Sequence, residues 1–311
     1  MTPLSLSRRE LMLALGAVVP AALRAQQQPA DQPTFSVDVK VVNLLATVRG
    51  PRGDLLRDLA KEEFTVLENG RPQTIRYFSR ETDLPLTIGL LIDTSLSQEK
   101  ILDAERAACF RFIDRVLRQG KDRFFVMQFD LGIFVNQQLT DSRLQLEEAL
   151  SQVGTPTRSE LALQTGGGTL LYEAVMRASR DIMAPESNRK ALILLSDGGE
   201  NGSVATGAEA VEAALRADTL LYSIFFKGRG PDGRENLAVL SRETGGSYFE
   251  VSKQRPIDDV FAGIEDELRG QYSIGYVSNH PLRQATFRRI EVTTTRPQAK
   301  VQSRSRYWAA I

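Results

Sequence analysis

The middle of the chain alternates between short apolar runs and amphipathic segments. Residues 86–92 form a nearly continuous apolar run, which is typical of a parallel strand covered on both faces. Apolar residues then recur at three- and four-residue steps and indicate a helix; they are Ile101, Ala104, Ala108, Phe112 and Val116. The same patterns predict further strands at 123–129, 133–139 (an edge strand), 191–195, 220–226 and 247–251. They predict further helices at 142–153, 169–183, 209–216, 236–244 and 257–268. This alternation predicts an α/β fold with a doubly wound, mostly parallel sheet and helices on both sides.

Both ends of the chain show a period of two, as half-buried strands do. Residues 35–48 alternate with one change of phase, which predicts a strand with a bulge. Segments 63–68 and 74–79 flank Asn69-Gly70, a pair that readily adopts the positive φ angles of a type I′ turn and so predicts a β-hairpin. Towards the C-terminus the same alternation returns, at 272–276, 287–295 and 301–307.

Neither of these flanks is long enough to build a hydrophobic core easily by itself. Together, residues 34–80 and 271–311 would make a smaller all-β, sandwich-like domain. The α/β domain, residues 84–268, would then be an insertion in it, because the termini of a domain often lie close together. The sequence therefore predicts one discontinuous β-domain around one α/β domain.

The first residues have the pattern of an export signal. Arg8 and Arg9 precede a charge-free apolar run that is too short to span a bilayer comfortably. We therefore expect a signal peptide over 1–25, cleavage near Ala25, and a periplasmic or extracellular protein. The arginine pair resembles a twin-arginine signal, with Sec export as the alternative. Residues 26–33, rich in Gln and Pro, are predicted to be a flexible leader, and no later stretch predicts a membrane span.

The composition narrows the classes of function. Lys plus Arg equals Asp plus Glu at 39 each, so no whole-chain field points to nucleic acid as a partner. The single cysteine, Cys109, cannot form a disulfide within the chain, and we expect a buried helix position rather than a reactive thiol. A binding function must therefore come from a local site.

Polar residues gather where predicted strands end and where a helix begins. Asp93, Ser95 and Ser97 directly follow the first apolar run. Thr169 comes after three glycines and ahead of a predicted helix, and Asp197 follows another strand. Because ligands of open α/β sheets bind outside the carboxyl ends of the strands, we expect these oxygens to converge. The alternatives are ordinary structural roles: helix caps, a flexible glycine loop and a turn after the second aspartate.

The spacing of these residues resembles a known family. Asp93-x-Ser95-x-Ser97 resembles the DxSxS motif of the metal-ion-dependent adhesion site (MIDAS) in von Willebrand factor type A (vWA) and integrin I domains. Thr169 and Asp197 are similar to that family's later threonine and aspartate, in the same order. The resemblance covers the α/β domain, and the β-flanks are similar to those of secreted bacterial VWFA-related proteins. It implies that the two serines bind a metal directly, the first aspartate holds it through water, and the threonine and second aspartate alternate between direct and water-bridged contact.

The chemistry of this set suits a hard cation. Mg²⁺ favours octahedral oxygen ligation and usually keeps some waters, so three hydroxyls and two carboxylates fit it, with Mn²⁺ or Ca²⁺ as alternatives. One position then stays open for water or for a partner's carboxylate. We therefore expect an exported, non-enzymatic binding or adhesion module that engages a protein ligand through an Asp or Glu. The alternative is a structural or assembly component of the cell envelope, in which the metal only stabilises loops.

Nucleotide binding and catalysis are disfavoured. No lysine follows the last glycine before Thr169, as a P-loop requires, so we expect no nucleotide. The single histidine, His280, lies in a predicted turn of the β-flank, so no Ser-His pair can form in the α/β domain. A metal-assisted hydrolase would need a general base, and none accompanies the predicted site.

Overall fold

The described part of the chain is built on one six-stranded and two four-stranded sheets. The computed structural model describes residues 41–80, 83–157, 168–228, 232–280 and 284–310. The predicted signal peptide, the leader and the start of the strand predicted at 35–48 lie outside the described residues. Among the helices that are described, none is long and apolar enough to cross a membrane.

The six-stranded sheet confirms the predicted doubly wound α/β fold. Its order is β10-β9-β8-β5-β6-β7, with neighbouring strands parallel except for the antiparallel edge strand β7. The strands are β5 (Leu86–Asp93), β6 (Arg123–Phe129), β7 (Ile133–Thr140), β8 (Arg189–Ser196), β9 (Thr219–Phe225) and β10 (Tyr248–Glu250). Every residue of β5 is buried, because helices cover both faces of the sheet at its centre.

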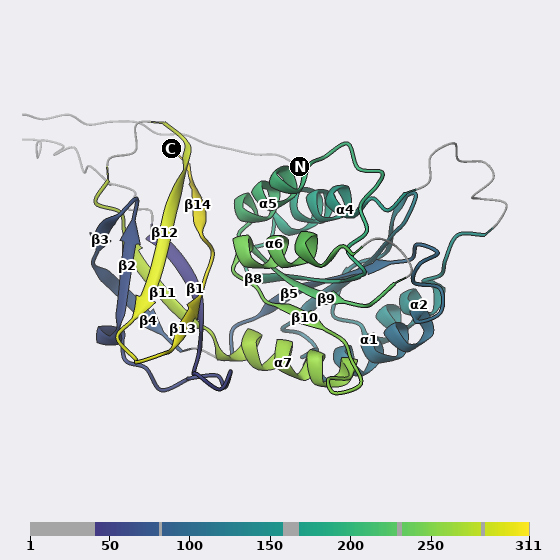
Figure 1. Ribbon diagram of the computed structural model, residues 1–311, viewed down its shortest axis with the longest axis horizontal. Helices are drawn as coiled ribbons and strands as arrows, with labels where there is room; N and C mark the ends of the chain where they lie inside the picture. Colours follow the sequence, from purple (N-terminus) through teal and green to yellow (C-terminus); the bar gives the residue numbers. More distant parts are fainter. Residues whose placement is uncertain (1–40, 81–82, 158–167, 229–231, 281–283, 311) are drawn as a thin grey trace, which may run out of the picture. The chain divides into compact units, whose positions relative to one another are not determined.

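Two sets of helices cover the two faces of this sheet (Figure 1). One face packs against α1 (Leu102–Val116), α2 (Arg143–Gln152) and α7 (Ile257–Gly270). The other packs against α4 (Leu171–Arg177), α5 (Gly207–Arg216) and α6 (Arg234–Thr244). The segment predicted as one helix at 169–183 consists of two parts: α4 is α-helical, and the following residues form a π-helical segment, η2 (Ala178–Met183).

The two flanks pair with each other in the two four-stranded sheets. The sheet orders are β13-β1-β11-β4 and β14-β12-β2-β3, so each sheet holds strands from both ends of the chain. The elements are β1 (Val41–Arg49), η1 (Lys61–Glu63), β2 (Phe64–Glu68), β3 (Arg71–Gln73), β4 (Ile75–Ser79), β11 (Tyr272–Val277), β12 (Thr286–Thr294), β13 (Lys300–Gln302) and β14 (Arg306–Ala309). This arrangement confirms the smaller all-β part of the predicted fold class. The domain boundaries stay a prediction.

Two strand predictions in the flanks are wrong in detail. Asn69 and Gly70 have the positive φ angles of a type I′ turn, at 48° and 77°, but the strand that pairs across this turn is β3. The segment predicted at 74–79 is instead β4, which pairs with β11 in the other sheet. The strand predicted at 301–307 is likewise two strands, β13 and β14, in different sheets. Alternation marks a strand but does not say with which sheet it pairs.

A buried polar cluster connects the two flanks. Glu68 of β2 pairs with Arg288 at 2.7 Å. It also accepts hydrogen bonds from the hydroxyls of Tyr276, Ser278 and Tyr307, at 2.8, 2.7 and 3.0 Å. Burial alone would raise the pKa of Glu68, but these four partners hold it below its usual value. The cluster satisfies a buried charge that would otherwise destabilise the fold.

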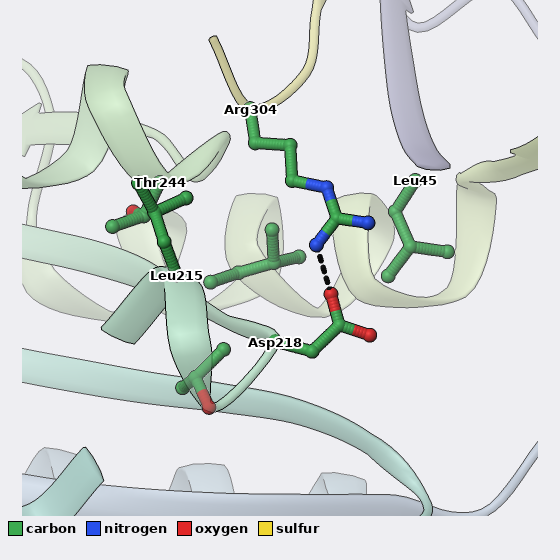
Figure 2. A pocket seen from close by; sticks show the side chains of 7 residues that line it. Leu45, Leu215, Asp218, Thr244 and Arg304 are labelled. Atoms are coloured by element: carbon green, nitrogen blue, oxygen red, sulfur yellow. Dashed lines mark hydrogen bonds and ion pairs between the residues drawn. The ribbon is translucent and has the colours of Figure 1, made fainter. Parts of the chain in front are cut away.

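A small cavity lies where β1 approaches the α5–β9 connection (Figure 2). Leu45, Leu215 and Thr244 line it, and Arg304 forms an ion pair with Asp218 across it. Its volume is about 10 Å³. That is the space of a single water molecule, so this cavity is no ligand site.

Candidate metal centre

Asp93 is the last residue of β5, and its carboxylate is held on both oxygens. Oδ1 accepts a hydrogen bond from the Ser95 backbone N–H at 2.9 Å, and Oδ2 accepts one from the Ser196 hydroxyl at 2.5 Å. Burial raises the pKa of Asp93 to about 7, and the charge of Asp197 adds to this, while the hydrogen bonds oppose it. The carboxylate is thus fixed in direction and poorly stabilised as an anion.

The loop after Asp93 brings two hydroxyls together. The Oγ atoms of Ser95 and Ser97 are 2.9 Å apart and half-buried. The loop is anchored to β6, because the Thr94 N–H donates to Phe129 O at 2.9 Å and the Thr94 hydroxyl donates to Asp130 at 2.6 Å. These anchors hold the serine pair at the carboxyl ends of β5 and β6.

Asp197 follows β8 and keeps one carboxylate oxygen free. Oδ1 accepts a hydrogen bond from the Gly199 N–H at 3.0 Å. Oδ2 is buried and has no hydrogen-bond partner within the described residues. It lies tightly against Gly228, where an added Cβ would be only 1.9 Å away. An unpartnered buried carboxylate oxygen is costly, so this atom is a suitable cation ligand.

The backbone of Thr169 is fixed by two neighbouring loops. Its N–H donates to the Asn201 side chain at 2.7 Å, and the N–H of the next residue, Leu170, donates to Asp130 O at 3.0 Å. Gly168 lies so close to the loop of Asn201 that a Cβ would come within 2.9 Å of that side chain. The other two glycines of the run lie outside the described residues. Thr169 is thereby tied to the loops that follow β6 and β8.

The structure therefore places the five sequence-predicted residues on connected loops at one edge of the sheet. Asp93 contacts Ser95 directly and reaches the end of β8 through Ser196, the neighbour of Asp197. Within the part of the chain that is described, no three His, Cys, Asp or Glu side chains are placed to hold a metal ion by themselves. A cation at this edge would need the hydroxyls as well as the two carboxylates. The assignment of the ligands stays a prediction.

Several residues that shape the site were not predicted from the sequence. Glu105 of α1 is fully buried, whereas Ala104, one of the recurring apolar residues that predict this helix, is exposed. Glu105 follows Ile101 by four residues and precedes Ala108 by three, so an acidic residue on the apolar stripe was the available signal. Asn201 and Gly228 carry no such signal, because their roles depend on loops that meet only in the folded chain.

The cysteine and the histidine lie as the sequence suggested. Cys109 is fully buried in α1, and burial raises the pKa of its thiol. His280 lies in the β-flank, where its Nδ1 is 3.4 Å from Arg71 Nη1. The α/β domain has no histidine to act as a base.

Comparison with known proteins gives a likeness in fold. No protein-family model and no curated protein matches the chain. A solved von Willebrand factor type A protein from Catenulispora acidiphila is 15% identical, with 88% of this chain and 75% of that chain covered and a TM-score of 0.49. The conserved hypothetical protein BatB from Bacteroides thetaiotaomicron is 16% identical; the match covers 59% of this chain and 97% of BatB, with a TM-score of 0.47. Proximal thread matrix protein 1 from the mussel byssus, with a zinc-occupied MIDAS motif, is 16% identical over 66% of this chain and 50% of its own, at a TM-score of 0.48.

Proposed function

We propose that the chain is an exported, non-enzymatic binding module that holds a divalent cation, Mg²⁺ first, and engages a protein partner through it. The observation that carries this proposal is the buried Oδ2 of Asp197, which lacks a hydrogen-bond partner within the described residues. The vWA-like motif and the paired hydroxyls of Ser95 and Ser97 support it. A divalent ion would satisfy the orphan oxygen and relieve the repulsion between Asp93 and Asp197.

The donor set leaves the ion accessible to a partner. Ser95 and Ser97 would hold the ion through their hydroxyls, and Asp93, Thr169 and Asp197 would supply the remaining oxygens, directly or through water. Two carboxylates neutralise a divalent ion without filling an octahedral shell, so a position stays for water or for the Asp or Glu of a partner.

Exposed apolar side chains lie in the loops that carry the ligands. Leu96, between the two serines, is 50% exposed, and Val204, in the loop after Asp197, is 91% exposed. Burial of apolar side chains stabilises a protein–protein complex, whereas a free ion or a small anion gains nothing from them. Their position favours a protein as the partner.

The metal proposal is tested by calorimetric titration and thermal melts of the mature protein with Mg²⁺ and Mn²⁺. Asp93→Ala, Ser97→Ala and Thr169→Ala should each weaken ion binding while the fold stays largely intact, because Asp93 is the last residue of β5 and the other two lie in loops, so none of them fills the hydrophobic core. Ser151→Ala, at the exposed end of α2, is the matched control and should bind like wild type. Absence of both binding heat and thermal shift in wild type at millimolar ion would overturn the proposal.

The partner proposal is tested separately, by capture on immobilised protein with and without EDTA. Partner binding that is lost with EDTA and with Thr169→Ala supports the binding module. Partner binding that survives both supports the structural alternative, in which the ion only stabilises loops.

The export proposal rests on the sequence of the first residues. Arg8 and Arg9 precede a modest apolar run, as in twin-arginine signals. Replacing both with lysine should keep the protein inside the cell, as followed by fractionation and immunoblotting. Normal export of that variant would show that the Sec route handles the protein.

A further inference from the structure

A third buried carboxylate lies close enough to the metal centre to interact with its aspartates. Glu105, in the first turn of α1, is fully buried, and neither of its carboxylate oxygens has a hydrogen-bond partner within the described residues. Burial raises the pKa of Glu105 well above its usual value, and the charges of Asp93 and Asp197 raise it further. The turn after Ser95 leads directly into this helix, because the Gln98 N–H donates to Ser95 O at 2.9 Å and the Leu102 N–H donates to Gln98 O at 3.1 Å.

The other buried carboxylates of the described chain have partners. Those outside this region each have an arginine: they are Glu68 with Arg288, Asp122 with Arg118, and Glu267 with Arg49. The remaining buried aspartates accept hydrogen bonds from Ser, Thr or backbone groups; they are Asp93, Asp130 and Asp197. Glu105 has neither kind of partner among the described residues. Burial without a compensating partner disfavours the charged form of a carboxyl group, which is the direction of the pKa shift at Glu105.

The turn that leads into α1 contains a second unsatisfied acceptor. Gln98 is fully buried; its Nε2 lies 3.4 Å from Ser97 Oγ, while its Oε1 has no partner within the described residues. Among the described residues, the orphan amide and carboxylate oxygens thus occur at Gln98, Glu105 and Asp197, while the one orphan hydroxyl, that of Ser179, lies in η2. A cation with its bound waters would satisfy acceptors of this kind.

We propose that Glu105 belongs to the metal centre and supplies a third negative charge that holds the cation from within the domain. This inference rests on the proposed metal binding. The ion provides the positive charge that Glu105 lacks in the protein. Because no three acidic side chains are placed to hold an ion directly in the described residues, Glu105 acts through its charge, as a positioning residue rather than a ligand.

The test compares ion affinities of wild type and Glu105→Gln by calorimetric titration of the mature protein. Glutamine keeps the shape and removes the charge, so the Kd for Mg²⁺ should rise about 10- to 100-fold, the range typical of groups just outside the ligand shell. The Kd for Tb³⁺ should rise by a larger factor, because the Coulomb interaction scales with the charge of the ion. Binding of Tb³⁺ at other places on the protein is measured with the Asp93→Ala variant and subtracted from the wild-type titration.

Two further variants separate charge from shape. Glu105→Asp keeps the charge and should retain most of the affinity. Asp103→Asn removes a charge from the same helix, where the side chain is 89% exposed, and should leave the Kd unchanged. The metal-free Glu105→Gln protein should melt no lower than wild type, since glutamine keeps the shape of the side chain and has no charged form to bury.

The outcomes are distinct. Wild-type affinity in Glu105→Gln would overturn the inference and leave the proposed function standing. Equal loss of Mg²⁺ and Tb³⁺ affinity without recovery in Glu105→Asp would also overturn it, since only the shape of the side chain would then matter. Absence of ion binding by wild type would overturn the proposed function and this inference with it.

Discussion

Replacing Gly228 with alanine tests whether Asp197 is a metal ligand. The added Cβ would lie 1.9 Å from Oδ2, 2.8 Å from Cγ and 2.9 Å from Cβ of Asp197. Non-bonded heavy atoms keep about 3.5–4.0 Å apart, so the carboxylate would have to withdraw by more than about 1 Å. Ligand distances in metal sites tolerate only about 0.2 Å, so the displaced carboxylate would no longer reach the ion.

The size of the effect follows from binding linkage. At free Mg²⁺ of about 100 times Kd, the ion stabilises wild type by about 2.7 kcal/mol, whereas a variant with a 100-fold weaker site gains only about 0.4 kcal/mol. Domains of this size shift by about 2–4 °C per kcal/mol, so the expected Tm gains are about 5–11 °C for wild type and about 1–2 °C for Gly228→Ala.

The assay is differential scanning calorimetry, with Mg²⁺ against EDTA for each protein. Taking the difference removes the cost of overpacking, which lowers both melts of the variant. Gly154→Ala is the control, because its added Cβ would meet nothing closer than 3.9 Å. A Mg²⁺ shift in Gly228→Ala as large as that of the control would refute the placement of Asp197 at the ion.

Three other predictions follow from the same structure. Because burial raises the pKa of Asp93 to about 7, the metal-free protein should lose stability as pH rises towards and through 7. The form of Asp93 that Mg²⁺ would bind is the ionised one, so the difference in Tm between the melts in Mg²⁺ and in EDTA should widen over that range. The pKa of Glu68 is held below its usual value, so its contribution is lost as pH falls through that lowered pKa, and Arg288→Met should cost about 3–5 kcal/mol in urea unfolding at neutral pH. Leu96→Ser and Val204→Ser should weaken partner binding measured by surface plasmon resonance while leaving the Kd for Mg²⁺ unchanged; weaker ion binding would contradict a role at the partner surface.

The fold of the α/β domain could be predicted because burial on both faces leaves a plain mark on the sequence. The apolar run at 86–92 is fully buried in β5, and the following strands and helices lie within a few residues of the predicted ones. The flanks were harder. Alternation marked their strands, but β3 and β4 follow each other closely and belong to different sheets. The change of partner depends on contacts with the opposite end of the chain, and no local period records them.

The candidate site shows the same limit. Asp93, Ser95 and Ser97 stand out because chemistry requires a fixed spacing directly after a strand. Gly228 is far from them in sequence, and its closeness to Asp197 depends on how two loops meet. Glu105 was missed because helix faces were traced through apolar residues, and a charged residue on such a face reads as a break in the pattern.

Three buried carboxylates without an ion-pair partner among the described residues, those of Asp93, Asp197 and Glu105, belong to or follow the loops of the candidate metal centre. Elsewhere in the described chain, buried carboxylates of Glu68, Asp122 and Glu267 form ion pairs with arginines. Around the candidate metal centre, burial raises the pKa values of Asp93 and Glu105, and the charge of Asp197 raises both further. Places where a fold departs from good local pairing are commonly functional. The proposed divalent ion would favour the ionised carboxylates, so ion binding and local order of these loops should rise together, and the surface offered to a partner should be well ordered only when the ion is bound.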